Sequence, residues 1–238
     1  MKILLLSDIH GNYPALSAIE TYFQGTSFAA ICNCGDSLVY APFPNETLHW
    51  LRDHQACSIL GNTDKKVKKL LLGKPLTKPK NAEKRIMYTW TAEHLEPIAR
   101  DYLFSLENSY MLTIGGQDIC LFHGSPEHPH EFLFADTERR RFEELAAKTA
   151  CPIIITGHSH SPYHKIVGTT HFINPGSVGR MFDANPAAAC AILTLDKKSV
   201  QVHHYRINWP VERMLKTLEL HNMPEIYQSM YIQGKKLN

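Results

Sequence analysis

The chain has 238 residues, of which 44% are hydrophobic and 20% charged, and its formal net charge is +2. These proportions are typical of a globular protein, and so small a charge argues against attraction to nucleic acid. No window approaches the roughly 18 uninterrupted apolar residues of a membrane-spanning helix, and the first residues lack a signal peptide's core and cleavage site. We therefore expect one cytoplasmic domain over residues 1–238, without membrane or nucleic-acid partners, and a homo-oligomer stays open.

The six cysteines lie in or beside apolar runs, and no two of them form a CxxC pair. In a chain without secretory features, such cysteines are typically thiols packed into the core. We expect buried thiols at all six positions, which are Cys32, Cys34, Cys57, Cys120, Cys151 and Cys190. The fourteen histidines are many for this length, and they are the one compositional feature that points toward metal.

An apolar run, Ile3 to Leu6, opens the chain and delivers Asp8 and His10 at its end. Such a run predicts a strand buried on both faces, and ligands of α/β proteins gather beyond the carboxyl ends of strands. Residues two apart in an extended backbone point the same way, so the carboxylate and the imidazole can converge on one point. The pair can begin a metal site, or it can be a helix cap beside a packed histidine.

A helix is expected next, because Asn12 can cap it and Pro14 falls in its first turn, where the missing N–H costs nothing. Two more buried strands are predicted at residues 28–34 and 56–60, separated by a helix over about 45–54. The sequence therefore starts with repeated β-α units.

Each of these two later strands also ends in polar residues. The second finishes in Gly35-Asp36 and the third in Gly61-Asn62-Thr63-Asp64. A glycine directly before the polar residue lets the backbone turn closely round a ligand. Together with Asp8, three consecutive strands thus end in metal-ligand types, which chance does not readily produce.

Residues 73–84 carry two prolines and several basic side chains with little apolar content, so we expect a surface segment there and leave open whether it acts as a lid. Thr91 is predicted to cap a helix that begins at that point, with Glu93 and Glu96 in its first turn, and another helix is expected up to Leu106.

The second half of the chain is rich in strands, and two of them end in histidines. The expected elements are a hairpin at 110–122 with a two-glycine turn, a helix at 137–149, a strand at 152–156, a turn at 174–179, strands at 187–195 and 200–207 joined by a turn at 196–198, and a peripheral helical tail over about 209–238. His123 follows the hairpin, and His158 and His160 follow the next strand. The order of elements predicts an α/β protein with two packed sheets flanked by helices.

The polar strand ends supply a set of nitrogen and oxygen donors of the right size for two divalent ions that share one carboxylate. The set consists of Asp8, His10, Asp36, Asn62, His123, His158 and His160. A single histidine is more often structural than a ligand, but this joint pattern favours ligands.

The motifs DIH, GD, GNTD, HG and GHSH, in this order, resemble the calcineurin-like metallophosphoesterases. Within that superfamily SDIHGN, WTAEHL, HGSP and INPGSVG look like the small bacterial and archaeal phosphodiesterase branch, which also contains the scaffold subunit of the eukaryotic retromer. The resemblance implies a four-layer α/β/β/α sandwich of two mixed sheets flanked by helices, with a two-metal centre.

By the same resemblance Asp36 would bridge the two metals. Asp8, His10 and His160 would complete one ligand set, and Asn62, His123 and His158 the other. Imidazole and carboxylate ligands suit Mn, Fe, Co, Ni or Zn better than an all-oxygen Mg shell. The implied activity is hydrolysis of small phosphodiesters or phosphoanhydrides, of nucleotide or dinucleoside polyphosphate type, by a metal-bridging hydroxide. The alternative is a catalytically silent binding or scaffold module on the same fold.

The sequence departs from the family pattern at Thr63, where many members carry a histidine thought to protonate the leaving oxygen. Threonine is no useful acid near pH 7, so the leaving group departs unprotonated or takes a proton elsewhere. Asp64 is the candidate catalytic residue, or merely a helix cap. The candidate substrate-binding residues are Asn12, Asn62, His94 and Arg180. Arg180 can clamp a phosphate and His94 can substitute as the acid, whereas Asn12 and His94 can also be caps or packing residues.

Overall fold

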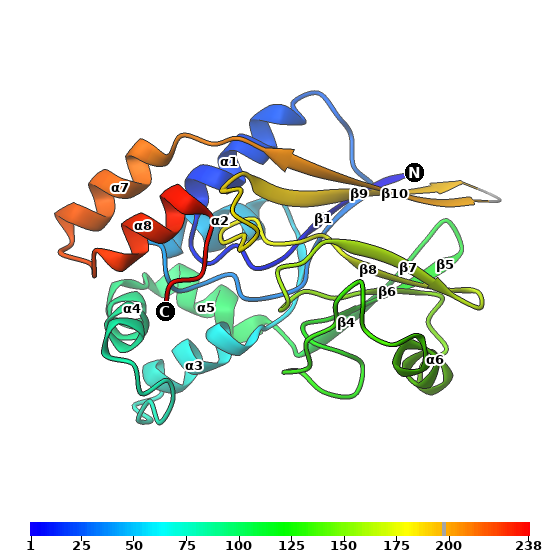
Figure 1. The fold of residues 1–238 in the computed structure, drawn as a ribbon, viewed down its shortest axis with the longest axis horizontal. Helices are drawn as coiled ribbons and strands as arrows, with labels where there is room; N and C mark the ends of the chain where they lie inside the picture. The colour runs from blue at the N-terminus through cyan, green and yellow to red at the C-terminus, as the bar shows by residue number, and fades with distance from the viewer. Residues whose placement is uncertain (197–198) are drawn as a thin grey trace.

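The computed structural model describes residues 1–196 and 199–238, and in it two five-stranded sheets stack face to face with helices on both outer sides (Figure 1). The turn predicted at 196–198 falls partly outside the described residues. The first sheet has the order β10-β9-β1-β2-β3. Its strands are β1 (Lys2–Leu6), β2 (Ala30–Asn33), β3 (Cys57–Ser58), β9 (Ala188–Asp196) and β10 (Ser199–Ile207). Strands β1, β2 and β3 are parallel, so their carboxyl ends meet at one edge.

The second sheet has the order β4-β5-β6-β8-β7. Its strands are β4 (Ser109–Ile114), β5 (Gln117–Phe122), β6 (Ile153–Ile155), β7 (Tyr163–Val167) and β8 (Thr170–Asn174). The predicted hairpin is confirmed as β4 and β5, and β5 runs parallel to β6. Parallel and antiparallel pairs occur in both sheets, which makes both of them mixed.

Alternation of side chains along the strands builds three hydrophobic cores. In β1, Ile3 and Leu5 point between the two sheets, while Leu4 and Leu6 point toward the helices on the other side. In β6, Ile154 belongs instead to the core under the outer helix of the second sheet. Because successive strand residues face opposite sides, continuous apolar strands serve two cores at once. Three cores separate four layers, which confirms the predicted α/β/β/α sandwich.

The helices are α1 (Tyr13–Tyr22), α2 (Pro44–Asp53), α3 (Asn62–Leu71), α4 (Ala82–His94), α5 (Pro97–Ser105), α6 (Arg139–Lys148), α7 (Val211–Leu220) and α8 (Ile226–Gln233). Helix α1 packs on β9 and β10, and α6 packs on β7 of the other sheet (Figure 1). Asn12 caps α1 as predicted, accepting a hydrogen bond from the Ala15 N–H at 3.1 Å. No helix in the described ranges is long and apolar enough to cross a bilayer.

The predicted helix start at Thr91 is wrong. Thr91 lies inside α4, and its hydroxyl donates to the Met87 carbonyl one turn earlier at 2.8 Å. The true cap is Asn81, whose side chain accepts from the Lys84 N–H at 2.9 Å. A helix interior can satisfy a threonine hydroxyl in this way, so a threonine followed by acidic residues does not by itself mark a helix start.

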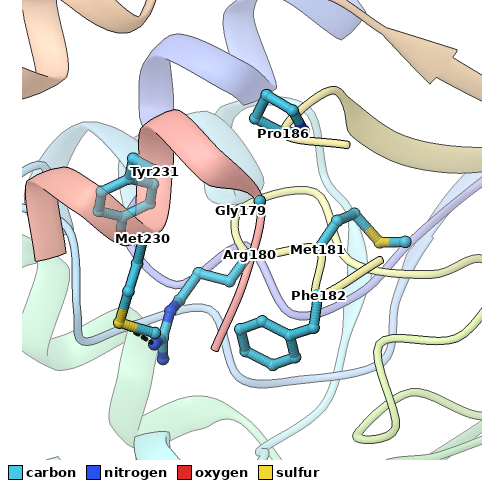
Figure 2. A pocket seen from close by; sticks show the side chains of 8 residues that line it. Gly179, Arg180, Met181, Phe182, Pro186, Met230 and Tyr231 are labelled. Carbon is cyan, nitrogen blue, oxygen red and sulfur yellow. Dashed lines mark hydrogen bonds between the residues drawn. The ribbon is translucent and has the colours of Figure 1, made fainter. Parts of the chain in front are cut away.

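The C-terminal tail is less peripheral than its sequence indicates. In α8, Tyr227, Met230 and Tyr231 are buried in the same core as the helix-facing residues of the first sheet. Figure 2 shows Met230 and Tyr231 beside Arg180, which lies about fifty residues earlier in the chain. The tail is thus part of the packing around the loop that carries Arg180.

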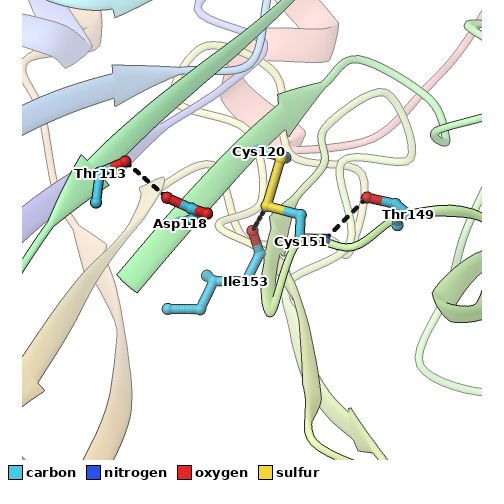
Figure 3. The surroundings of a disulfide bond; sticks show 6 residues. All are labelled: Thr113, Asp118, Cys120, Thr149, Cys151 and Ile153. Atoms are coloured by element: carbon cyan, nitrogen blue, oxygen red, sulfur yellow. Dashed lines mark hydrogen bonds between the residues drawn. A yellow bond between two sulfur atoms is a disulfide. The ribbon is translucent and has the colours of Figure 1, made fainter. Parts of the chain in front are cut away.

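The prediction of six thiols is wrong for two of them, because Cys120 and Cys151 form a disulfide (Figure 3). Their positions are 31 residues apart, and their Cα atoms lie 6.2 Å apart. Cys120 is in β5 and Cys151 lies two residues before the neighbouring strand β6, so the sheet brings the two together. Of the free cysteines, Cys57 is half-buried and the other three are buried.

Candidate metal centre

Loops that follow five strands meet at one end of the sandwich, and backbone hydrogen bonds hold them in place. The His10 N–H donates to the Asp36 carbonyl at 2.9 Å, and Gly157 N–H donates to the His123 carbonyl at 2.9 Å. Across the two sheets, the His158 N–H donates to Asp8 Oδ2 at 2.9 Å. The polar strand ends predicted from the sequence therefore share one edge, where they face one another.

Five residues at this edge adopt a left-handed backbone conformation, with φ between 52° and 65°. They are Asp8, His10, Asp36, His158 and His160. Left-handed backbone costs a residue with a side chain on the order of 1 kcal/mol and collects at functional sites. The expectation that Asp8 and His10 converge through an extended backbone is wrong in its reason, since the turned backbone brings them together.

The first cluster of metal-ligand type joins Asp8, His10 and His160. His160 Nε2 lies 3.2 Å from Asp8 Oδ1, and His10 Nε2 lies 3.2 Å from His160 Nε2. The Nδ1 atoms of His10 and His160 face the carbonyls of Leu38 and Arg180, so Nδ1 carries the proton and Nε2 a lone pair.

Two lone pairs that face each other, next to a carboxylate, repel unless a cation lies among them. Asp8 Oδ1 is moreover buried without any hydrogen-bond partner. A buried polar atom without a partner costs about 1–3 kcal/mol, so its position calls for a ligand. The donor atoms of this cluster therefore fit a divalent ion.

The second cluster joins Asp36, His123 and His158. His123 Nε2 lies 3.5 Å from Asp36 Oδ1 and 3.3 Å from Asn62 Oδ1, while its Nδ1 donates to the Cys34 carbonyl at 2.8 Å. The fixed tautomer again turns Nε2 inward. These side chains present nitrogen and oxygen donors to a common point.

Asp36 lies between the clusters. Its Oδ2 is 4.0 Å from His10 Nε2 in the first cluster, and its Oδ1 faces His123 in the second. The backbone N–H of Thr63 donates to Oδ1 at 2.8 Å and fixes the carboxylate. The Asp36 carboxylate thus faces both sets of donors.

The protonation of these groups follows from burial and mutual attraction. Burial lowers the pKa of His10 to about 3 and the pKa of His158 to about 4, which keeps both imidazoles neutral. Burial acts to raise the pKa of Asp8, but His160 and His123 together outweigh burial, and the pKa falls to about 2. For His123 burial acts to lower the pKa, yet the Asp36 carboxylate raises it to about 9. A metal ion has to displace that proton.

Two glycines allow the loops after β2 and β3 to touch. A Cβ at Gly35 would lie 2.5 Å from the Gly61 nitrogen, and a Cβ at Gly61 would collide with the Asp36 carboxylate and backbone. A side chain at either position would thus overlap with atoms of the neighbouring loop. The glycines before the polar residues therefore permit a close approach, as expected, although the partner is the neighbouring loop.

Asp64 lies beneath the site and does not line the pocket. Its buried carboxylate accepts hydrogen bonds from the backbone N–H groups of Ser37, Leu38 and Gly61 at 3.2, 3.0 and 2.9 Å. Burial, followed by the charge of Asp36, raises the pKa of Asp64 to about 7. These contacts support the cap, which joins two ligand-bearing loops, and leave Asp64 no access to a substrate.

Two predicted substrate-binding residues also lie away from the pocket. Asn12 is buried, caps α1 and donates to the Gly179 carbonyl at 3.1 Å. His94 stacks on Trp90 at a ring distance of 4.1 Å, with its Nδ1 2.8 Å from the Trp90 carbonyl. Ten residues of α4, or roughly 15 Å of helix, separate it from the pocket-lining Lys84. The structure does not bring either of them to the pocket that His10 and Asp36 line.

Arg180 and Asn62, the other two, do line the pocket, which has about 140 Å³ of solvent-accessible space. The Arg180 guanidinium lies 3.9 Å from the centre of the Tyr40 ring and 5.3 Å from that of Phe182. Figure 2 shows it extended between Met230 and Phe182. An arginine held by rings keeps its charge and its forked donors free for a ligand.

Four further residues line this pocket that the pattern of polar strand ends does not predict. Phe132 stacks on His158 and Phe182 on His160, at ring distances of 4.1 and 4.7 Å. Lys84 and Lys236 line the pocket from α4 and from the C-terminal tail. None of the four stands at a strand end, so the pattern used to find the ligands could not reveal them.

A four-layer sandwich whose two sheets present buried aspartates and histidines at one edge defines the metallophosphoesterase class of α/β proteins. The chain belongs to the calcineurin-like phosphoesterase superfamily, whose family model matches residues 1–198. The resemblance carried by the five ordered motifs is thereby confirmed.

The relatives include phosphodiesterases and proteins of unknown activity. An uncharacterized protein of Methanocaldococcus jannaschii is 28% identical over 94% of both chains, and the phosphodiesterase YfcE of Escherichia coli is 26% identical over 79% of this chain and 85% of its own. A hypothetical protein of Pyrococcus horikoshii has a TM-score of 0.86 at 20% identity and 99% coverage of both chains. A metallophosphoesterase of Sphaerobacter thermophilus has a TM-score of 0.78 at 24% identity, covering 98% and 99%. The two structures support the fold alone.

Proposed function

We propose that the protein is a phosphoesterase dependent on two divalent metals, and that it hydrolyses small phosphodiesters or phosphoanhydrides. The observation that carries the proposal is the position of Asp36, whose two oxygens face the two donor clusters. The unpartnered Asp8 Oδ1 supports it further. Family membership supports a phosphoesterase in general, and the phosphodiesterase among the relatives supports the narrower class.

One ion would be held by Asp8, His10, Asp36 and His160, and the other by Asp36, Asn62, His123 and His158. Neutral imidazoles and carboxylates suit Mn, Fe, Co, Ni or Zn. When bound, two such ions supply Lewis acidity that activates water and neutralises charge on a phosphoryl group. The carbonyls behind His10, His123 and His160 keep the Nε2 atoms aimed inward.

The residues of the chain also constrain the leaving group. Thr63 lines the pocket where a proton donor would be useful, its hydroxyl donates to the Leu38 carbonyl at 3.1 Å, and His94 lies too far away to substitute. The pKa of the protonated leaving group is near 15 for an alcohol and near 6–7 for a phosphate. Only the departure of an alcohol therefore depends strongly on a proton donor, and such general-acid catalysis accelerates a reaction roughly 10²–10⁴-fold. We therefore infer phosphoanhydrides, or diesters with acidic leaving groups, as substrates.

We also propose that the protein is located in the cytoplasm. The disulfide between Cys120 and Cys151 bears on it, since reducing compartments disfavour such bonds. A free thiol at Cys120 in protein alkylated directly in intact cells would support the cytoplasm, and a blocked one would oppose it.

Turnover of bis(p-nitrophenyl) phosphate tests the proposed activity. The chelator-treated protein should be inactive and regain activity with Mn²⁺, and Asp36→Asn should lose at least one bound ion together with activity. Asp101→Asn, on the exposed side of α5, is the matched control and should keep both. Full two-ion occupancy in Asp36→Asn would overturn the ligand assignment, and a metal-loaded wild type without turnover would favour the scaffold alternative.

A further inference from the structure

Three cationic side chains outside the donor clusters line the same pocket as His10 and Asp36. They come from separate parts of the chain, Lys84 from the first turn of α4, Arg180 from the loop before β9, and Lys236 from the C-terminal tail. Such convergence of like charges at one pocket is unfavourable by itself, because each cation repels the others. A pocket built in this way is suited to an anion.

Glu83 acts on Lys84 from a distance, but no carboxylate of the described residues forms an ion pair with these three side chains. None of them takes part in an ion pair anywhere in residues 1–196 and 199–238. Burial lowers the pKa of Lys84, and the charges of Lys236 and Arg180 lower it further. The cations therefore act on one another across the pocket.

Arg180 is held in place without losing its charge. Its guanidinium lies over Tyr40 at 3.9 Å and near the Tyr227 ring at 5.7 Å, and it contacts the Met230 sulfur at 3.6 Å. Aromatic faces and a thioether attract a guanidinium but do not neutralise it. The side chain is thus fixed while its positive charge stays available.

The total charge decides between kinds of substrate. Two divalent ions held by two carboxylates would leave the centre with about two excess positive charges before any hydroxide is counted. Lys84, Arg180 and Lys236 add three more at the same pocket. A simple phosphodiester carries one negative charge, whereas linked phosphates carry several, so linked phosphates match this pocket better.

We propose that Lys84, Arg180 and Lys236 form a distal phosphate subsite that binds a second phosphate group of the substrate beside the one at the metal centre. The inference rests on the proposed function and narrows it to compounds with two or more linked phosphates. Lys236 lies beyond residues 1–198, which the family description covers, so the subsite depends on the C-terminal tail of this chain.

The first test is binding of inorganic tripolyphosphate to the metal-free protein by titration calorimetry. Lys84→Gln and Lys236→Gln should each raise the Kd for tripolyphosphate about 5–10-fold, because each variant loses a charge-assisted contact. The double variant should raise the Kd further. Lys80→Gln and Lys235→Gln are matched controls, since both lysines are exposed and do not line the pocket. Equal weakening in the controls would overturn the subsite in favour of unspecific attraction.

The second test compares two substrates on the Mn²⁺-loaded protein. For Lys84→Gln/Lys236→Gln, kcat/KM toward diadenosine tetraphosphate should fall at least about tenfold more than toward bis(p-nitrophenyl) phosphate, chiefly through KM. An equal fall with both substrates would overturn the inference and leave the proposed function intact. If the wild type turns over neither substrate, the proposed function fails, and the tripolyphosphate titration still supports or overturns the subsite.

Discussion

Replacing Asp64 with alanine should loosen the candidate metal centre from below. The buried carboxylate accepts the backbone N–H groups of Ser37, Leu38 and Gly61, and so joins the loop after β2 to the loop after β3. Without it three buried donors lose their acceptor, at about 1–3 kcal/mol each. Because relaxation and water entry recover part of that cost, we expect the free energy of unfolding to fall by about 3–5 kcal/mol.

Urea unfolding of the metal-free protein, followed by circular dichroism, measures this loss. Asp101→Ala, at an exposed position of α5, is the control and should change the free energy of unfolding by less than about 0.5 kcal/mol. Mn²⁺ affinity should fall in the Asp64 variant, because the loops that carry Asp36 and Asn62 are then joined less firmly, chiefly through the Thr63 N–H that donates to Asp36. An unchanged unfolding midpoint together with a lower kcat would refute the positioning role and favour Asp64 as an acid.

Three further predictions concern the leaving group, the ligand protons and the disulfide. Across aryl phosphodiesters, log kcat should fall steeply as the leaving phenol becomes more basic, and Thr63→His should raise the slowest rates about tenfold or more; a flat dependence at a chemistry-limited step would mean that an acid is present. Because Asp36 raises the pKa of His123 to about 9, metal affinity should increase with pH up to that value, and metal binding should release a proton. Calorimetry in buffers of different ionisation enthalpy measures this proton release. A metal affinity that does not change between pH 6 and pH 9 would contradict the prediction. Reduction of the Cys120 to Cys151 disulfide, which closes a loop of 31 residues, should lower the free energy of unfolding by about 3–4 kcal/mol, and identical urea midpoints with and without reductant would contradict that expectation.

The layered fold could be predicted because its causes are local. Apolar runs such as Ile3 to Leu6 serve two cores at once, and polar residues directly after such runs mark the edge where ligands gather. Asp8, Asp36 and His123 were found in this way, since a residue that follows a parallel strand has its position fixed by the sheet.

The rest depends on contacts between distant parts of the chain. The disulfide forms because two neighbouring strands bring Cys120 and Cys151 together, and no spacing in the sequence reveals that pairing. Lys236 reaches the pocket only because α8 packs into the core near Arg180. The chemistry of His94 suits proton donation, but α4 carries this residue away from the pocket, and there it stacks on Trp90. Side-chain chemistry alone cannot supply such geometry.

The left-handed backbone at the site is a further feature that the sequence does not predict. Asp8 and His10 have φ values of 52° and 54°, which a pattern of extended strand residues does not predict. The two residues nevertheless converge, because hydrogen bonds to the loop after β2 fix the turned backbone, including the one that the His10 N–H donates to the Asp36 carbonyl at 2.9 Å.

The claim of a two-metal centre bridged by Asp36 is tested most directly by anomalous diffraction from crystals of the Mn²⁺-loaded protein. We expect two peaks, one among Asp8, His10 and His160 and one among Asn62, His123 and His158, with Asp36 in contact with both. A single peak, or two peaks of which only one contacts Asp36, would contradict it.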